Sequence, residues 1–165
     1  MNIIKYPNKI LRKKLERFAD FSNSELKKFI KDMSDLMLKS DGVGLAANQV
    51  NSEIRVMIAN TKNGPIAFFN PRLIKKSILK SSSEEGCLSF PKIYGNVRRY
   101  KKITLEYEDI SGKTKQIQAH GLLSVVLQHE TDHLNGILFI DKIKKFTDGR
   151  ERLEELKKIA KENEK

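Results

Sequence analysis

The feature that most constrains the fold of this chain is the pentapeptide His129-Glu130-Thr131-Asp132-His133, which follows a run of apolar residues. Side chains at positions i and i+4 of a helix share a face, so a helix here presents both histidines together. The apolar residues between 122 and 127 and Leu134 predict that this helix is largely buried, with the rest of the fold around it. Two imidazoles four residues apart, with a glutamate directly after the first, are typical of metal-assisted amide hydrolysis, in which the glutamate reaches a water instead of the metal.

A catalytic metal site needs a third protein ligand and one open position, and Cys87 is the candidate ligand. It is the one cysteine of the chain, and His120 is the one histidine outside the pentapeptide. A thiolate is a strong, soft donor for a transition metal. The alternative is that Cys87 is a buried, inert side chain that packs like a small hydrophobe.

A third cluster, from Gly42 to Gln49, reads Gly-Val-Gly-Leu-Ala-Ala-Asn-Gln. A dinucleotide-binding loop needs a strand before it, and the preceding segment has a helical pattern, so we reject that interpretation. Closely spaced glycines and alanines indicate that the backbone approaches a ligand or another element, with the Gln49 amide beside it. The alternative is a glycine that ends a helix before a strand, with Gln49 exposed.

Together the three clusters resemble the motifs of one family, the peptide deformylases. The family patterns GxGxAAxQ, EGCLS and HExxH occur here in that order, as Gly42 to Gln49, Glu85 to Ser89 and His129 to His133. The resemblance implies a hydrolase that removes the formyl group from the N-terminal formylmethionine of newly made polypeptides and releases formate. It also implies an α+β fold with antiparallel sheets packed around the helix that carries the metal motif.

The resemblance implies that Cys87, His129 and His133 hold one divalent metal ion per chain. A metal ion lowers the pKa of a bound water, and Glu130 would take its proton and deliver it to the leaving amine. Fe²⁺ is the metal that the resemblance implies in the cell. Zn²⁺, Ni²⁺ and Co²⁺ also suit sulfur and imidazole donors and would occupy the site in some preparations.

The remaining motif residues are assigned to the substrate. By the resemblance, the Gln49 side chain and the Leu88 backbone N–H donate hydrogen bonds to the oxyanion formed from the formyl group. Gly44 lacks a Cβ, and together with Val43 it would let the substrate backbone pair with the protein as an added strand.

Three further residues have more than one interpretation. Val125 and Val126 lie one turn before His129, so they form either the wall of the methionine pocket or plain core. Glu85 is grouped with the substrate-binding residues; it could instead orient a metal ligand from behind, or be an exposed loop residue. Some bacterial members carry an arginine after the cysteine motif that touches the peptide beyond the methionine. Residues 92–95 here, Lys-Ile-Tyr-Gly, lack that arginine.

The formal net charge is +11, from 32 lysines and arginines against 21 aspartates and glutamates. Lysines occur along the whole chain, which favours a general compositional bias over a site for specific nucleic-acid recognition. The resemblance adds a possible transient association with the ribosome near its exit tunnel, because deformylases act on chains that leave the ribosome. We expect no membrane association, a monomer, and a location in the bacterial cytoplasm or in an organelle matrix.

Periodicity predicts the elements. Apolar residues at helical spacing from residue 26 to 37 predict a helix that stops near Ser40, preceded by a capping box at Ser22 to Glu25. Strands are expected at 54–59, 66–69, 74–79, 93–99, 103–107 and 115–118, with Pro71 ending the second. The serines 81–83 are expected to form a loop, and a charged helix from about residue 148 to 165 closes the chain. This order favours an α+β fold in a single catalytic domain, residues 1–165.

Two other functions compete with the deformylase interpretation. A zinc endopeptidase also uses HExxH, but such enzymes recruit a third ligand after the helix, and no histidine follows His133. A basic RNA-binding domain would explain the charge and leave the three motifs without a role.

Overall fold

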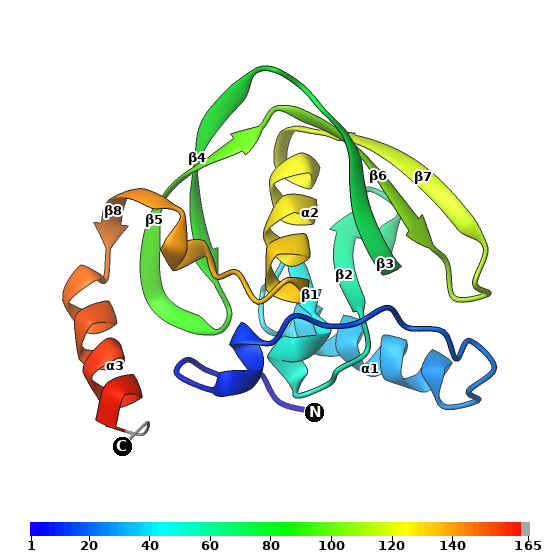
Figure 1. Ribbon diagram of the computed structural model, residues 1–165, viewed down its shortest axis with the longest axis horizontal. Helices are drawn as coiled ribbons and strands as arrows, with labels where there is room; N and C mark the ends of the chain where they lie inside the picture. Colours follow the sequence, from blue (N-terminus) through cyan, green and yellow to red (C-terminus); the bar gives the residue numbers. More distant parts are fainter. Residues whose placement is uncertain (163–165) are drawn as a thin grey trace.

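The computed structural model describes residues 1–162 of the chain (Figure 1). Its α-helices are α1 (Leu26–Lys39), α2 (Gly121–Leu134) and α3 (Arg150–Glu162). Its strands are β1 (Gly44–Ala46), β2 (Val56–Thr61), β3 (Gly64–Lys76), β4 (Lys80–Cys87), β5 (Phe90–Tyr100), β6 (Lys102–Glu108), β7 (Thr114–His120) and β8 (Ile143–Asp148). The closing helix therefore begins at Arg150, and residues 163–165 of the expected helix lie outside the described part. Within that part, no helix is both long and apolar enough to cross a bilayer.

Two antiparallel sheets enclose α2. One sheet has the strand order β1-β2-β3-β6-β7, and the other has the order β4-β5-β8, so β1 and β4 are edge strands. Figure 1 shows α2 between the two sheets, with α1 and α3 at the periphery and both chain ends on the same side of the molecule. The predicted α+β class, with antiparallel sheets around the motif-bearing helix, is confirmed.

One face of α2 is fixed by the apolar core. Val126, Leu127 and Leu134 of α2 share a cluster of buried residues with Met57 of β2 and Phe68 of β3. Full burial of an aliphatic side chain contributes about 1.5–3 kcal/mol, so this contact sets the rotation of α2 about its own axis. Thr131 of the pentapeptide contacts Met57 of that cluster, whereas His129 and His133 lie near Cys87 of the other sheet.

The N-terminal helix α1 has the predicted apolar face but not the predicted capping box. Leu26, Met33 and Met37 are buried against β1 and β2. The helix begins at Leu26, and Asn23 Oδ1 accepts a hydrogen bond of 2.9 Å from the Glu25 N–H. The Ser22 hydroxyl bonds Asp20 instead, so the capping-box prediction is wrong.

Strand β3 is longer than expected and continues through Pro71 to Lys76. The register between β3 and β6 shifts between Phe69 and Arg72, which places the proline in an irregular part of the ladder. Proline has no N–H to donate, and strands tolerate it at such irregularities. The expectation that Pro71 ends the strand is therefore wrong, and residues 74–76 belong to β3 instead of a separate strand.

The serines 81–83 are part of β4, not a loop. Ser81 lies opposite Arg99 and Ser83 opposite Val97 on β5. Serine has little intrinsic preference for strands, so pairing with the long neighbouring strand, not local propensity, extends this segment. The third strand of this sheet, β8, was not predicted, and it pairs with the other side of β5.

Candidate active site

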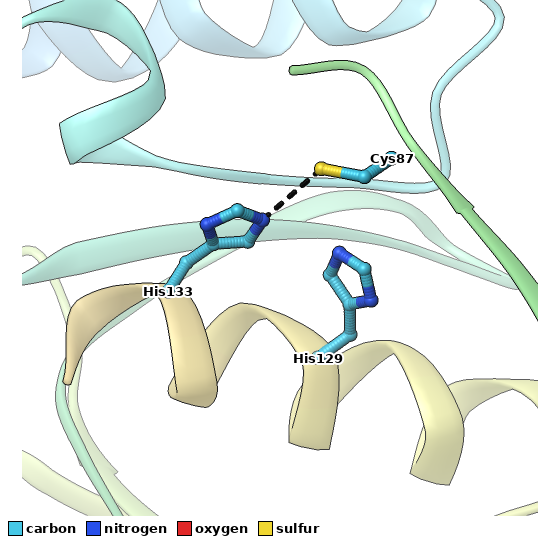
Figure 2. A group of neighbouring side chains, drawn as sticks. All are labelled: Cys87, His129 and His133. Carbon is cyan, nitrogen blue, oxygen red and sulfur yellow. Dashed lines mark hydrogen bonds between the residues drawn. The ribbon is translucent and has the colours of Figure 1, made fainter. Parts of the chain in front are cut away.

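The two histidines of the pentapeptide and the cysteine converge on one point (Figure 2). His129 and His133 project from α2 with ring centroids 5.0 Å apart, and both are buried. Cys87 approaches from the end of β4, and its Sγ lies 3.2 Å from His133 Nε2. One possible ligand atom from each of the three residues lies within 4.8 Å of the others.

An irregularity in the sheet brings Cys87 to this position. The register of β4 and β5 shifts between Gly86 and Cys87, where the ladder ends and the chain turns back at Phe90. Gly86 lies so close to Tyr94 that a Cβ there would stand 2.6 Å from the ring. The glycine before the cysteine therefore permits the close packing of the two strands at the bend.

These residues fit a divalent transition metal. One thiolate sulfur and two imidazole nitrogens are three donors of a tetrahedral site, and the fourth position stays open for water or substrate. Cys87 Sγ and His133 Nε2 lie close enough together that both would bind the same metal ion. The resemblance of the three motifs to those of the peptide deformylases implies the same three ligands, and in the structure these residues lie together.

A buried ionic network supports His129 from behind. Glu85 Oε2 lies 2.8 Å from His129 Nδ1, and Arg99 donates to both oxygens of Glu85 at 2.7 and 2.9 Å. Arg99 also donates to Asp132 at 2.5 Å, and Lys142 contacts the same carboxylate. Burial alone would raise the pKa of Glu85, but the hydrogen bonds from Arg99 and His129 lower it to about 2. An ionised Glu85 keeps a proton on Nδ1 of His129, which leaves Nε2 free to act as a ligand.

The sequence did not identify Arg99, although a signal for it existed. Its partner Glu85 is on another strand, and no local motif connects the two residues. Along β5, however, Ile93, Val97 and Arg99 are all buried and share the same parity. Side chains two apart in a strand share a face, so this alternation places one charged residue in the core and implies a buried partner. The alternative that Glu85 is an exposed loop residue is wrong, because it is 6% exposed and both its oxygens are bonded.

Glu130 faces β1 rather than the network. Its side chain is buried, and burial raises the pKa of its carboxyl to about 7. A Cβ on Gly44 would lie 2.5 Å from Glu130 Oε1 and 2.8 Å from Val126. The close approach expected of this glycine is therefore an approach to the helix α2, and it leaves room for the Glu130 carboxylate. A carboxyl with a pKa near neutrality can both accept and donate a proton at working pH.

The Gln49 amide is held in one orientation. Its Oε1 accepts a hydrogen bond of 2.9 Å from the Ala46 N–H, and its Nε2 donates to Ser89 Oγ at 3.1 Å. The same Nε2 lies 3.5 Å from Cys87 Sγ. One amide hydrogen is thus bound by Ser89, and the other is directed toward the ligand cluster. Ser89 was part of the recognised motif but had no predicted role, and Gln49 is buried, not exposed as in the alternative.

The site opens into a cavity of about 570 Å³. Its lining contains residues from all three motifs, including Gly44, Gln49, Cys87, Leu88 and Glu130, together with Val43, Val125 and Val126. Val43 is 47% exposed, Val125 is half-buried and Val126 is buried. Four further charged residues line the cavity: Lys5, Asp41, Glu84 and Lys92.

Known proteins are similar to this chain in both sequence and fold. The sequence profile of the polypeptide deformylase family matches residues 1–148. A peptide deformylase of Brucella suis is 43% identical over 151 residues, covering 87% of this chain and 84% of that protein. The crystal structure of peptide deformylase from Thermotoga maritima has a TM-score of 0.84 and 38% identity, covering 87% of this chain and 97% of that chain. A peptide deformylase from Synechococcus elongatus, in complex with actinonin, has a TM-score of 0.84 and 32% identity, covering 94% and 82%. This chain therefore belongs to the polypeptide deformylase family.

Proposed function

We propose that this deformylase acts on N-formylmethionyl peptides with the roles that its motifs predict for the residues of one cavity. The observation that carries the proposal is the convergence of three separate motifs on that cavity. As a member of the family the protein is a hydrolase that removes the N-formyl group from newly made polypeptides. The endopeptidase and RNA-binding alternatives do not fit this membership.

Cys87, His129 and His133 are the proposed metal ligands. A divalent ion held there would polarise the formyl carbonyl and make hydroxide available near neutral pH. We propose Fe²⁺ as the ion in the cell, with Zn²⁺, Ni²⁺ or Co²⁺ in preparations, since sulfur and imidazole donors suit all four. Glu85 acts here by orienting His129, a role that its two bonded oxygens support over direct contact with substrate.

Glu130 is the proposed general base and acid. Its carboxylate takes the proton from the attacking water and later delivers that proton to the nitrogen of the leaving methionine amine. Its buried position on α2, one residue from the ligand His129, places it at the cavity wall. Gly44 leaves the space that the carboxylate occupies, because a Cβ there would stand 2.5 Å from Glu130 Oε1.

The formyl oxygen is the proposed acceptor of two hydrogen bonds. The Gln49 side chain offers one N–H and the Leu88 backbone offers the other. Donors that are already in place where negative charge develops typically contribute about 3 kcal/mol each to the transition state. Ser89 and Ala46 fix the Gln49 amide, so its N–H needs no reorganisation when the charge forms.

The substrate chain is proposed to lie between the edge strands β1 and β4. Gly44 of β1, the preceding Val43 and the end of β4 line the cavity. An extended peptide would add to these edges through backbone hydrogen bonds. The methionine side chain would rest against Val125 and Val126, with the downstream subsite formed without an arginine in the 92–95 segment.

The cellular context is proposed from the related proteins and from the net charge. Related proteins include bacterial enzymes and a chloroplastic deformylase of Solanum lycopersicum, which supports a cytoplasmic or organellar location. The net charge of +11 is compatible with transient association with the ribosome. We propose that residues 1–165 form one catalytic domain that acts as a monomer, without specific nucleic-acid recognition or membrane association.

The deciding experiment compares formyl-Met-Ala-Ser with an unformylated, end-blocked longer peptide. We expect formate release from the first and no cleavage of the second. Replacement of formyl-Met by formyl-Ala should lower kcat/KM more than about tenfold, because each lost methylene costs about 0.8 kcal/mol of burial. Cleavage of the internal peptide bond without formate release would contradict the proposal, whatever the metal content.

A further inference from the structure

An N-terminal arm, residues 4–6, crosses the side of the site that carries the proposed oxyanion donors. The Ile4 N–H donates to the Gln49 carbonyl at 2.7 Å, and the Tyr6 N–H donates to the Ser89 carbonyl at 3.0 Å. The Tyr6 ring also stacks on Phe90, with centroids 5.0 Å apart. The arm therefore joins the 3₁₀ helix of Gln49, which follows β1, to the turn between β4 and β5, which follows the cysteine.

Lys5 lies between these two contacts and reaches the same segment with its side chain. Its Nζ donates a hydrogen bond of 2.5 Å to the Leu88 carbonyl, and the residue lines the cavity. The aliphatic part of Leu88 is held from the other side, because a Cβ on Gly42 would stand 2.8 Å from Leu88 Cδ1. Leu88 is thus fixed at its carbonyl by the arm and at its side chain by the segment after α1.

The proposed role of Leu88 requires its N–H to be held in a defined position. It lies outside the paired strands, in the two-residue turn between β4 and β5, so no ladder partner fixes its peptide units. A donor to a developing oxyanion must be held to within roughly 0.5 Å of its productive position. A charged donor at the adjoining carbonyl is a stronger restraint than a neutral one.

We propose that Lys5 is a positioning residue for deformylation: by binding the Leu88 carbonyl it fixes the Leu88–Ser89 peptide unit, and through it the adjoining Leu88 N–H that meets the formyl oxygen. The inference rests on the proposed role of Leu88. The ammonium group also adds a positive charge to the cavity wall beside the point at which negative charge develops. No motif of the sequence includes this lysine, which stands before the Tyr6-Pro7 pair.

A purely structural role of Lys5 predicts a loss of stability when the side chain is removed, whereas the positioning role predicts a loss of turnover. The side chain is exposed, and hydrogen bonds and ion pairs at exposed sites contribute little to folding. Loss of the contact should therefore leave the melting temperature almost unchanged and act on kcat, because the restraint is used only when the oxyanion forms.

The test compares Lys5→Met, Lys5→Arg and the control Lys9→Met, an exposed lysine outside the cavity, in the zinc-loaded protein. With formyl-Met-Ala-Ser, Lys5→Met should lower kcat about tenfold with little change in KM, a fraction of the effect of deleting an oxyanion donor. Lys5→Arg keeps the charged donor and should restore most of kcat, and Lys9→Met should match the wild type. Equal kcat values for Lys5→Met and Lys9→Met would overturn the proposal, and so would equal losses in both Lys5 variants accompanied by a fall in melting temperature.

A second measurement needs no turnover and therefore separates this proposal from the proposed function. Amide hydrogen exchange of Leu88, followed by NMR, should become several-fold faster in Lys5→Met and stay unchanged in Lys5→Arg and Lys9→Met. Unchanged Leu88 exchange in Lys5→Met overturns the positioning role even if the protein releases no formate. A wild type that releases no formate while Leu88 exchange responds as expected would contradict the proposed function alone.

Discussion

The two halves of the site are built in different ways. On the metal half, His129 is held by side-chain charges: Glu85 bonds its ring, and Arg99 joins Glu85 to Asp132. On the oxyanion half, Gln49 and Leu88 are held mainly by backbone groups, small residues and the N-terminal arm. The metal half is centred on one helix, α2, whereas the oxyanion half combines the buried Gln49 of a short 3₁₀ helix with Leu88 of a turn, and the N-terminal arm contacts both segments.

This difference predicts that substitutions in one half act on protein stability, whereas substitutions in the other half act on the catalytic rate. The charges of the metal half are mutually dependent, because removal of one leaves another buried without a partner. The contacts of the oxyanion half are individually modest in folding energy, and they matter at the moment when negative charge develops. Substitutions in the metal half should therefore affect folding or metal retention, and those in the oxyanion half should affect turnover. Glu130 lies on α2, but its substitution should lower turnover and leave folding and metal retention unchanged, as expected for the oxyanion half.

The largest expected effect follows from Glu130→Gln. The amide has nearly the same shape and cannot accept the proton, so kcat should fall by about 10²–10⁴-fold. Metal content and melting temperature should stay close to those of the wild type, since the three proposed ligands are untouched. Formate release measures the first and atomic absorption the second, with Glu53→Gln as an exposed control. A variant that retained more than about a tenth of the wild-type kcat would exclude Glu130 as the essential base.

Arg99→Met tests the ionic network of the metal half. It leaves the carboxylates of Glu85 and Asp132 without their shared partner, and breaking a buried pair costs about 3–5 kcal/mol of unfolding free energy. Urea denaturation measures this loss, and chelator competition should show faster metal release. The matched control is Arg72→Met, because Arg72 is 73% exposed in its pair with Glu106 and should contribute at most about 1 kcal/mol. Equal losses in the two variants would show that the network has no special role.

Gln49→Leu tests the oxyanion half. It removes a donor at similar size, and kcat should fall by about 10²–10³-fold while the metal is retained. Ser89→Ala removes only the contact that orients the Gln49 amide, so its effect on kcat should be smaller and in the same direction. A Gln49→Leu protein that lost its metal but kept its turnover per bound metal would reverse the division between the two halves.

Leu153→Ala should have the smallest effect on turnover. Leu153 of α3 is 1% exposed and packs with the cluster around Phe90 and Phe139. Loss of its side chain should lower the unfolding free energy by about 2–4 kcal/mol through the cavity it leaves, with kcat unchanged at temperatures where the protein is folded. A kcat that falls together with stability would show that the α3 region also supports the site.

Helices and ligands were predictable from the sequence because their patterns are local. The apolar spacing of α1 and the positions of His129 and His133 on one face of α2 need only helical geometry. Cys87 was found through its motif, since nothing local indicates which helix it will meet. The structure brings these proposed ligands together.

Features set by strand pairing were not predictable in the same way. Ser81 to Ser83 form a strand because β5 supplies partners, and β3 continues past Pro71 because an irregular register accommodates it. Arg99 and Lys5 act on residues far away in the sequence, so no window of neighbouring residues contains the interaction. The contacts that tune this site are tertiary, whereas the groups proposed to perform the chemistry are visible in short motifs.

The proposed pairing of the substrate with the edge strands β1 and β4 limits how well the enzyme can distinguish one polypeptide from another. Backbone N–H and C=O groups are the same in every residue, so a strand added between these edges conveys almost no information about the polypeptide it belongs to. Proline is the exception, because it has no N–H to offer. Selectivity then resides in the formylated end group, and a single enzyme of this design can serve a whole proteome whose members have nothing in common but their first residue.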